Sequence, residues 1–333
     1  MSANRSSRFD LKLSRDFSIY MFICLLLGLA AASRSFPLVH AAKAAVEEIE
    51  VIYVNHAATG ANDGSSWQHA FTTLQAALDT ASVGDEIWVA RGTYLPTQLL
   101  DISAPASATF SIKSGVNLFG GFTGVETQRQ QADWQANPTI LSGDLEQNDV
   151  DINHDGMLSI TETVGLNARH VLFVLNITDP IGIDGFFIQS GFNNSGSGAG
   201  LYLENIKLVM RNTVVRFNHA VNGGGLYAYY CSTTLEQVTF LGNSAVIGDT
   251  GGGGGASIFG TIGSGQVLDD VIFDSNQAGY AGGGGLRAEH SWTVVINSSF
   301  VRNLAVSNFY ITDPMGGGGM FVQSGNLILE SSI

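Results

Sequence analysis

Residues 223–243 read GGGLYAYYCSTTLEQVTFLGN, and this stretch decides the fold. It consists of a glycine run, the pair Leu-Tyr, a variable segment and then Phe-x-x-Asn. A glycine run followed by an apolar or small residue returns four more times in the second half of the chain. The last glycines of the five runs are Gly200, Gly225, Gly255, Gly285 and Gly319, spaced by 25, 30, 30 and 34 residues. This regular return identifies an internal repeat.

An asparagine closes each of the first four units. It follows the anchor glycine by 18 residues in three units and by 21 in the Gly255 unit, with Val or Phe three residues before it. Each strand in such a unit is short and is bounded by Gly or Asn turns. One unit cannot bury its apolar face alone, so the units must stack. Stacking at a strand spacing of about 4.8 Å makes an all-β parallel β-helix, a single-stranded solenoid.

Aligning the units predicts columns of equivalent residues. The apolar columns are expected to face inward; they are Leu201, Leu226, Ala256, Leu286, Met320, and Met210, Leu235, Leu268, Val295, Leu329. Phe240, Phe273 and Phe300 are expected to stack on one another. The closing asparagines are expected to form an amide ladder at a turn, in left-handed backbone; they are Asn218, Asn243, Asn276 and Asn303. A second turn ladder is expected at Asn212, Gln237, Asp270, Asn297 and Ser331.

The first half of the chain is expected to begin the same solenoid. Apolar residues at helical spacing predict a helix over 71–81, which would cap the open end. Irregular early turns are predicted from strand-like segments at 52–54, 86–90, 107–112, 116–119, 170–175 and 183–188. The expected organisation is a signal peptide at 1–44, a cap and irregular turns at 45–190, and Gly-rich repeats at 191–333. Because the last unit stops before its Phe and Asn, we expect the repeat to be truncated at Ile333.

The N-terminus has the pattern of a secretory signal. Four basic residues precede an uncharged, mostly apolar run of 17 residues from Phe17 to Ser33, and small residues follow as cleavage sites. The alternative is an uncleaved anchor. We expect a secreted or cell-surface protein with no membrane span after signal removal. With 29 acidic and 15 basic residues the net charge is −14, which argues against nucleic acid as a partner.

Several motifs resemble the opening of bacterial pectin-lyase-like β-helix proteins. They are Tyr53-Val54, the Asn62-Asp63-Gly64-Ser65-Ser66-Trp67 segment, Gly84 to Tyr94, Gly120-Gly121-Phe122 and Ile140 to Asp144. The Gly-Gly-Leu and Phe-x-x-Asn units resemble repeats of polymorphic outer-membrane proteins. Together the resemblance covers residues 50–333 and implies a right-handed parallel β-helix and export. It implies little about activity, because this fold carries lyases, hydrolases, adhesins and autotransporter passengers.

A twelve-residue segment, 151–162, matches the calcium loop of EF-hands within an insertion near 144–168. Oxygen ligands are predicted at positions 1, 3, 5, 7, 9 and 12 of the loop; they are Asp151, Asn153, Asp155, the carbonyl of Met157, Ser159 and Glu162. The preceding segment is a poor helix and the loop is single, so we expect a structural Ca²⁺ that pins the insertion. The alternative is a solvated acidic insertion.

A catalytic site is the weaker of two functional hypotheses. Uronate lyases need an Arg or Lys base and a cationic clamp. Candidate residues gather in the aligned repeats at Arg211, Arg216, Asp269, Asp270 and Asp274. The alternative is an ordinary solvated face, and the motifs of characterised pectate lyases and polygalacturonases are not recognisable. The enzyme hypothesis is therefore a polysaccharide lyase.

The stronger hypothesis concerns an outward column of aromatic residues. Aromatic and charged side chains recur at repeat spacing and could contact sugars; they are Tyr202, Tyr227, Tyr229, Phe259, Arg287 and Phe321. Such residues could equally be cross-strand pairs that stabilise the sheet. From these patterns we expect an extracellular scaffold or adhesin-like surface that binds a glycan or a cell surface.

Overall fold

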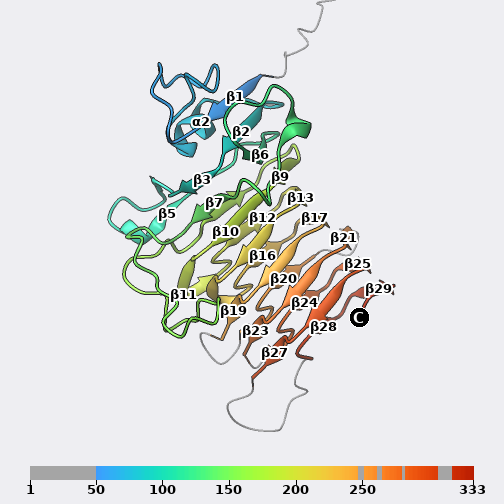
Figure 1. Cartoon of the computed structure of the whole chain (residues 1–333). Helices are drawn as coiled ribbons and strands as arrows, with labels where there is room; N and C mark the ends of the chain where they lie inside the picture. The colour runs from blue at the N-terminus through green and yellow to red at the C-terminus, as the bar shows by residue number, and fades with distance from the viewer. Residues whose placement is uncertain (1–49, 247–250, 261–264, 280–281, 307–316) are drawn as a thin grey trace, which may run out of the picture. The chain divides into compact units, whose positions relative to one another are not determined.

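The structure is a computed structural model that describes residues 50–246, 251–260, 265–279, 282–306 and 317–333. These residues belong to one compact unit. The predicted signal peptide at 1–44 lies outside the described residues. Parallel strands stack in four sheets, so the predicted parallel β-helix is confirmed (Figure 1).

Each sheet collects one strand from successive coils. Sheet 1 contains β1 (Val51–Val54), β2 (Glu86–Ala90), β6 (Asn117–Phe122), β9 (Ile181–Asp184), β13 (Lys207–Arg211), β17 (Ser232–Glu236), β21 (Gly265–Asp269), β25 (Trp292–Ile296) and β29 (Asn326–Glu330). Sheet 2 contains β3 (Gly92–Tyr94), β7 (Thr139–Ser142), β10 (Phe186–Gln189), β14 (Val214–Arg216), β18 (Thr239–Leu241), β22 (Ile272–Asp274) and β26 (Ser299–Val301).

The other two sheets complete the coil. Sheet 3 contains β8 (Leu172–Leu175), β12 (Leu201–Glu204), β16 (Leu226–Tyr229), β20 (Ala256–Phe259), β24 (Leu286–Glu289) and β28 (Met320–Gln323). Sheet 4 contains β11 (Phe192–Ser197), β15 (His219–Asn222), β19 (Ser244–Ala245), β23 (Gln277–Ala278) and β27 (Leu304–Ala305). A full coil therefore runs through sheets 3, 1, 2 and 4 in that order.

The strand register confirms the predicted columns. Leu201 pairs with Leu226, and the column continues through Ala256 and Leu286 to Met320. The second apolar column, from Met210 to Leu329, is likewise in register on sheet 1. Most of these side chains are fully buried, so the core is a set of apolar columns inside the coil.

The aromatic stack and the asparagine ladder are also present. The Phe240 and Phe273 ring centroids are 4.9 Å apart, and those of Phe273 and Phe300 are 4.8 Å apart, with nearly parallel planes. The side-chain amide of Asn218 donates to that of Asn243, and the pattern repeats to Asn276 and Asn303 at 3.0 Å each time. These columns tie neighbouring coils together where the chain leaves sheet 2.

The backbone at the turns differs from the prediction in one respect. The left-handed residue is not the ladder asparagine but the one before it: Phe217, Gly242, Ser275 and Arg302 have φ between 54° and 61°. The asparagine side chain instead bonds backbone groups of neighbouring coils, as Asn243 does to the carbonyl of Val215. The second predicted turn column does have positive φ throughout, at Asn212, Gln237, Asp270, Asn297 and Ser331.

Glycine is required where coils approach closely. A Cβ on Gly225 would lie 2.5 Å from the carbonyl oxygen of Gly255 in the next coil, and one on Gly255 would lie 2.6 Å from that of Gly285. The anchor glycines therefore permit the stacking of coils at the entrance to sheet 3.

The N-terminal half forms the expected irregular coils. Helix α2 (Leu74–Thr80) is capped by Thr73 and buries Leu74, Ala77 and Leu78 in the core cluster. The predicted strand at 183–188 is two strands, β9 and β10, because Gly185 makes a corner at φ 84°. The predicted strand at 107–112 is much shorter: its first residue ends the short helix η1 (Pro105–Ser107), and only β5 (Ala108–Thr109) is a strand, which pairs with β4 (Gln98–Leu99).

Candidate functional site

The aromatic column lies on sheet 3, with the register that the repeats predict. Tyr202 pairs with Tyr227, then Ser257, Arg287 and Phe321 follow in the same column. A neighbouring column runs through Glu204, Tyr229, Phe259, Glu289 and Gln323. The strands that carry these residues, β8 to β28, lie side by side (Figure 1). We call the outward side chains of these two columns, together with His170, Phe173 and Tyr230, the aromatic strip.

The rings of the aromatic strip contact one another across the coils. Ring centroids are 5.1 Å apart for Phe173 and Tyr202 and 5.3 Å for Tyr202 and Tyr227, with planes within 27° of parallel. The contact continues from Tyr227 to Phe259 at 5.6 Å. Stacked rings cover one another's faces, so this part of the strip presents ring edges and hydroxyl groups to solvent. A flat sugar ring therefore cannot lie on the faces of Tyr202 or Tyr227.

Charged groups complete the strip. The Arg287 guanidinium lies 5.7 Å from the Phe259 ring and 5.9 Å from the Phe321 ring, and it pairs with Glu289. The hydroxyl of Tyr202 donates to Glu204 at 3.2 Å. Burial raises the pKa of Tyr227 to about 12, so its hydroxyl stays protonated at neutral pH and can donate a hydrogen bond.

Two members of the strip, His170 and Phe173, were missed in the sequence. No glycine run precedes the coil that contains them, so this coil was not recognised as a unit of the repeat. The alternation Leu-Phe-Val-Leu at 172–175 matches Leu-Tyr-Leu-Glu at 201–204 and could have found it. The strip therefore begins one coil earlier than the repeats indicate.

The candidate catalytic residues are distributed over two sheets. Arg211 and Asp269 lie on sheet 1, two strands apart, which is about 10 Å. Arg216 and Asp274 lie two strands apart on sheet 2, and Asp270 lies at the corner between the sheets. The structure therefore does not gather the five residues into one constellation.

Most of the candidate catalytic groups already have partners. Arg211 makes a two-bond ion pair with Glu236, at 2.6 and 3.2 Å. Asp274 pairs with Arg302, which holds the pKa of that carboxyl below its usual value. Asp269 accepts from the side chain of Asn297 at 3.1 Å. These contacts link neighbouring coils, so the side chains of Arg211, Asp274 and Asp269 already have structural roles.

Arg216 differs from these groups because its partners are uncharged. Its guanidinium lies 5.1 Å from the Phe187 ring and 5.3 Å from the Phe217 ring, and it donates to the side-chain oxygen of Gln189 at 2.6 and 2.8 Å. None of the ion pairs among the described residues includes it. Burial lowers its pKa below the usual value for arginine.

The predicted calcium loop lies in an insertion between β7 and β8. An antiparallel bridge between Asp144 and Asn167 closes the neck of the insertion. The Glu162 carboxylate, 5% exposed, accepts from the backbone of Ile152 at 3.0 Å and of Ser159 at 2.9 Å. The last ligand position of the loop thus folds back onto the first residues, as the EF-hand pattern requires.

One oxygen in this loop suggests a missing partner. Asp151 Oδ2 accepts from Gly156 at 2.9 Å, whereas Oδ1 is buried with no hydrogen-bond partner among the described residues. An unpartnered buried carboxylate oxygen is costly, and a cation would satisfy it. In the described part of the chain no group of three or more His, Cys, Asp or Glu side chains is arranged to hold a metal ion. The loop would also draw on Asn153, Ser159 and a backbone carbonyl.

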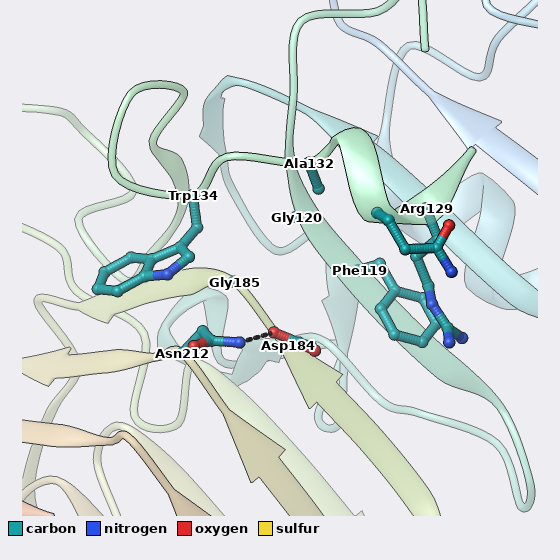
Figure 2. Close-up of a pocket in the computed structure, with 9 residues that line it drawn as sticks. Phe119, Gly120, Arg129, Ala132, Trp134, Asp184, Gly185 and Asn212 are labelled. Atoms are coloured by element: carbon teal, nitrogen blue, oxygen red, sulfur yellow. Dashed lines mark hydrogen bonds between the residues drawn. The ribbon is translucent and has the colours of Figure 1, made fainter. Parts of the chain in front are cut away.

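A separate hollow occurs where sheets 1 and 2 meet in the early coils. It has a volume of about 250 Å³, and Figure 2 shows Phe119 and Arg129 on one side of it and Trp134 on the other. Asp184 accepts from the side chain of Asn212 at 2.8 Å between them. Nothing in the sequence marked this site, because its residues come from segments that are far apart in the chain.

Comparison with known proteins gives little further information. No protein-family model matches the chain, and no curated protein matches it. Among solved structures, a rhamnogalacturonan lyase is similar with a TM-score of 0.35 and 14% sequence identity, over 83% of this chain. The match spans 62% of the length of that lyase. At this level of similarity the fold assignment stands on the strand pairing alone. Within the described residues, no helix has the length and apolar character needed to cross a bilayer.

Proposed function

We propose that this protein is a non-catalytic, extracellular β-helix whose aromatic strip binds glycans at a cell surface. The observation that carries the proposal is the extent of the strip from Phe173 to Phe321, across six strands of sheet 3. Ring edges and hydroxyl groups in neighbouring coils suit an extended polymer, and the strip is interrupted at Ser257 and Glu289, which are buried. The export pattern in the sequence and the repeats resembling those of polymorphic outer-membrane proteins support the location.

The mode of contact follows from the ring geometry. Because Tyr202 and Tyr227 stack on each other, they offer hydroxyl groups rather than faces to a ligand. Tyr230, 43% exposed, lies at the corner beside Tyr229 with ring centroids 4.0 Å apart. The hydroxyl groups of Tyr202 and Tyr227 belong to neighbouring coils, which are about 4.8 Å apart. A glycan chain would therefore run along the solenoid axis and bond to both coils.

We further propose that loop 151–162 holds a structural Ca²⁺ through the six ligands that the sequence predicts. The unbonded, buried Asp151 Oδ1 supports this assignment. Bound calcium would fix the insertion against the coil, where a Cβ on Gly242 would lie only 2.4 Å from the Met157 side chain.

A uronate lyase is the second candidate, and Arg216 is the observation that favours it. A half-buried arginine with a lowered pKa and no paired carboxylate is the type of base that such a reaction needs. The other candidate acids and bases are held in ion pairs and turns, so the binding proposal is preferred.

The binding proposal is tested by retention of the purified protein on immobilised polysaccharides. Variants Tyr202→Ala, Tyr227→Ala and Tyr230→Ala are compared with Trp292→Ala, which removes a half-exposed aromatic residue from sheet 1. The proposal predicts weaker retention for the three tyrosine variants and unchanged retention for Trp292→Ala. Equal retention for all four folded variants would contradict it.

A further inference from the structure

The hollow beside Trp134 is built by a loop that is fixed in place. Residues 123–138 join β6 to β7, and the Glu126 carboxylate accepts from three successive backbone N–H groups, of residues 123–125, at 2.7 to 3.0 Å. The indole N–H of Trp67 donates to the Glu126 carbonyl at 2.8 Å. The Glu126 carboxylate thus fixes the turn at the start of the loop, and the bond from the Asp133 N–H to the Gly121 carbonyl, at 2.9 Å, ties the loop to β6. The walls that the loop supplies are therefore preformed without any ligand.

Three glycines let the loop lie close to the coil. A Cβ on Gly121, whose φ is 87°, would lie 2.7 Å from the backbone nitrogen of Trp134. A Cβ on Gly120 would lie 2.4 Å from the carbonyl oxygen of Gly185. Glycine at these positions therefore lets the Trp134 segment and the Gly185 corner lie directly against β6, beside the hollow.

The walls of the hollow are aromatic. Trp134 packs against Phe187 with ring centroids 6.0 Å apart, which holds the indole in place on one side. On the other side the Arg129 guanidinium lies 4.7 Å from the Phe119 ring and is fixed by a 2.7 Å ion pair to Glu86. Figure 2 shows these two walls with Asp184 and Asn212 between them.

The floor supplies hydrogen-bonding groups of both kinds. Asp184 uses Oδ1 to accept from Asn212, and its second oxygen has no partner among the described residues. The amide oxygen of Asn212 and the remaining N–H groups of Arg129 are likewise without partners there. Acceptors and donors thus converge on a space of about 250 Å³, below the roughly 300–1,000 Å³ of pockets that hold drug-sized ligands.

The local charge is set by Asp184. Arg129 pairs with Glu86, and Arg211, one strand from Asp184 on sheet 1, pairs with Glu236, so among the described residues Asp184 has no ion pair. A carboxylate ligand would meet the negative charge of Asp184, and the loss of hydration of an ammonium ligand would be only partly compensated there. A neutral ring with several hydroxyl groups satisfies the donors, the acceptors and the flat walls together.

We propose that this hollow is a binding site for a single neutral hexose unit. The ring lies between Trp134 and the Phe119–Arg129 pair, and its hydroxyl groups bond to Asp184, Asn212 and Arg129. The site is separate from the aromatic strip, which lies on sheet 3, and it would give the protein a second and more selective sugar contact.

The test is titration of the purified protein with methyl glycosides of glucose, galactose and mannose, followed by tryptophan fluorescence and calorimetry. Methyl galacturonoside and methyl glucosaminide serve as charged comparisons. At least one neutral glycoside is expected to bind, more tightly than both charged ones. Trp134→Ala and Asp184→Asn are expected to weaken that binding about tenfold or more, which is about 1.4 kcal/mol or more.

Two controls separate this site from other effects. Trp292→Ala removes a tryptophan far along sheet 1 and should bind the glycoside as the unchanged protein does. Tyr227→Ala alters the aromatic strip and should also leave glycoside binding intact, while Trp134→Ala should leave retention on polysaccharide intact. No binding by any neutral glycoside, preference for a charged glycoside, or full binding by folded Trp134→Ala would overturn the inference.

Discussion

Asn218 donates its side-chain amide to the side-chain oxygen of Asn243, 3.0 Å away in the next coil. Asn243 makes the same bond to Asn276 and a second one to the Val215 carbonyl at 2.8 Å. Asn243 is fully buried, and its side-chain oxygen also accepts from the backbone N–H of Asn218 at 3.1 Å. The side chain of Asn243 therefore satisfies several buried groups at once.

Asn243→Ala is therefore expected to be strongly destabilising. It removes the partner of the Asn218 backbone N–H and the bond that Asn243 donates to the Val215 carbonyl, at about 1–3 kcal/mol for each buried group left unpaired. Denaturation monitored by circular dichroism measures the loss. Asn303→Ala, at the less buried end of the ladder, should cost clearly less. Equal losses for the two variants would show that the ladder does not act as described.

The phenylalanine stack gives a second prediction. Phe273 lies between Phe240 and Phe300 and is fully buried, so Phe273→Ala should lower the free energy of unfolding by about 3–5 kcal/mol. Phe300 is only partly buried and has one stacking partner among the described residues. Phe300→Ala should therefore cost less than Phe273→Ala in the same denaturation experiment, and the reverse order would contradict the packing.

Much of this repeat could be predicted because equivalent residues in successive units share their chemistry. Leu201 and Leu226, or Phe240 and Phe273, lie one coil apart, and the register was readable from the spacing alone. The left-handed corners were harder to place. Phe217 and Arg302 have positive φ, which bulky side chains rarely adopt, so local preference indicated the neighbouring asparagines instead.

The candidate sites, too, could be predicted only in part from the spacing of the repeats. The outward column of the aromatic strip follows from repeat spacing, whereas the stacking of Tyr202 on Tyr227 depends on side-chain orientation that spacing does not give. The hollow at Trp134 was not predicted at all. It joins a loop to the corners of two other coils through Phe119, Asp184 and Asn212, and no period in the sequence connects them.

Loop 151–162 is expected to bind calcium and to raise the thermal midpoint when it does, because a ligand that binds only the folded state stabilises it. Calorimetry should show a heat of Ca²⁺ binding that disappears in Glu162→Ala. Glu146→Gln is the matched control, since Glu146 lies in the same insertion and accepts from Leu166 at 3.0 Å. Absence of binding, or its persistence in Glu162→Ala, would show that the insertion is only a solvated acidic loop.

Stability should also fall on mild acidification because of His170. Burial lowers the pKa of His170 below 6.5, so as the pH falls below 6.5 the unfolded chain takes up this proton more readily than the folded chain. His170→Asn removes this contribution and retains an N–H donor near the position of Nδ1, which lies 2.8 Å from the Gly198 carbonyl oxygen. The difference in unfolding free energy between about pH 7 and about pH 5 should be smaller in His170→Asn. An identical pH dependence would rule out this role.

The most direct test of the account is to incubate the protein with polysaccharides that it retains and to measure their chain length and the ultraviolet absorbance of unsaturated uronides. The account predicts binding that depends on Tyr202 and Tyr227, with no shortening of the polymer and no unsaturated product. Production of unsaturated uronides that is lost in Arg216→Ala would contradict the account and identify the protein as a lyase.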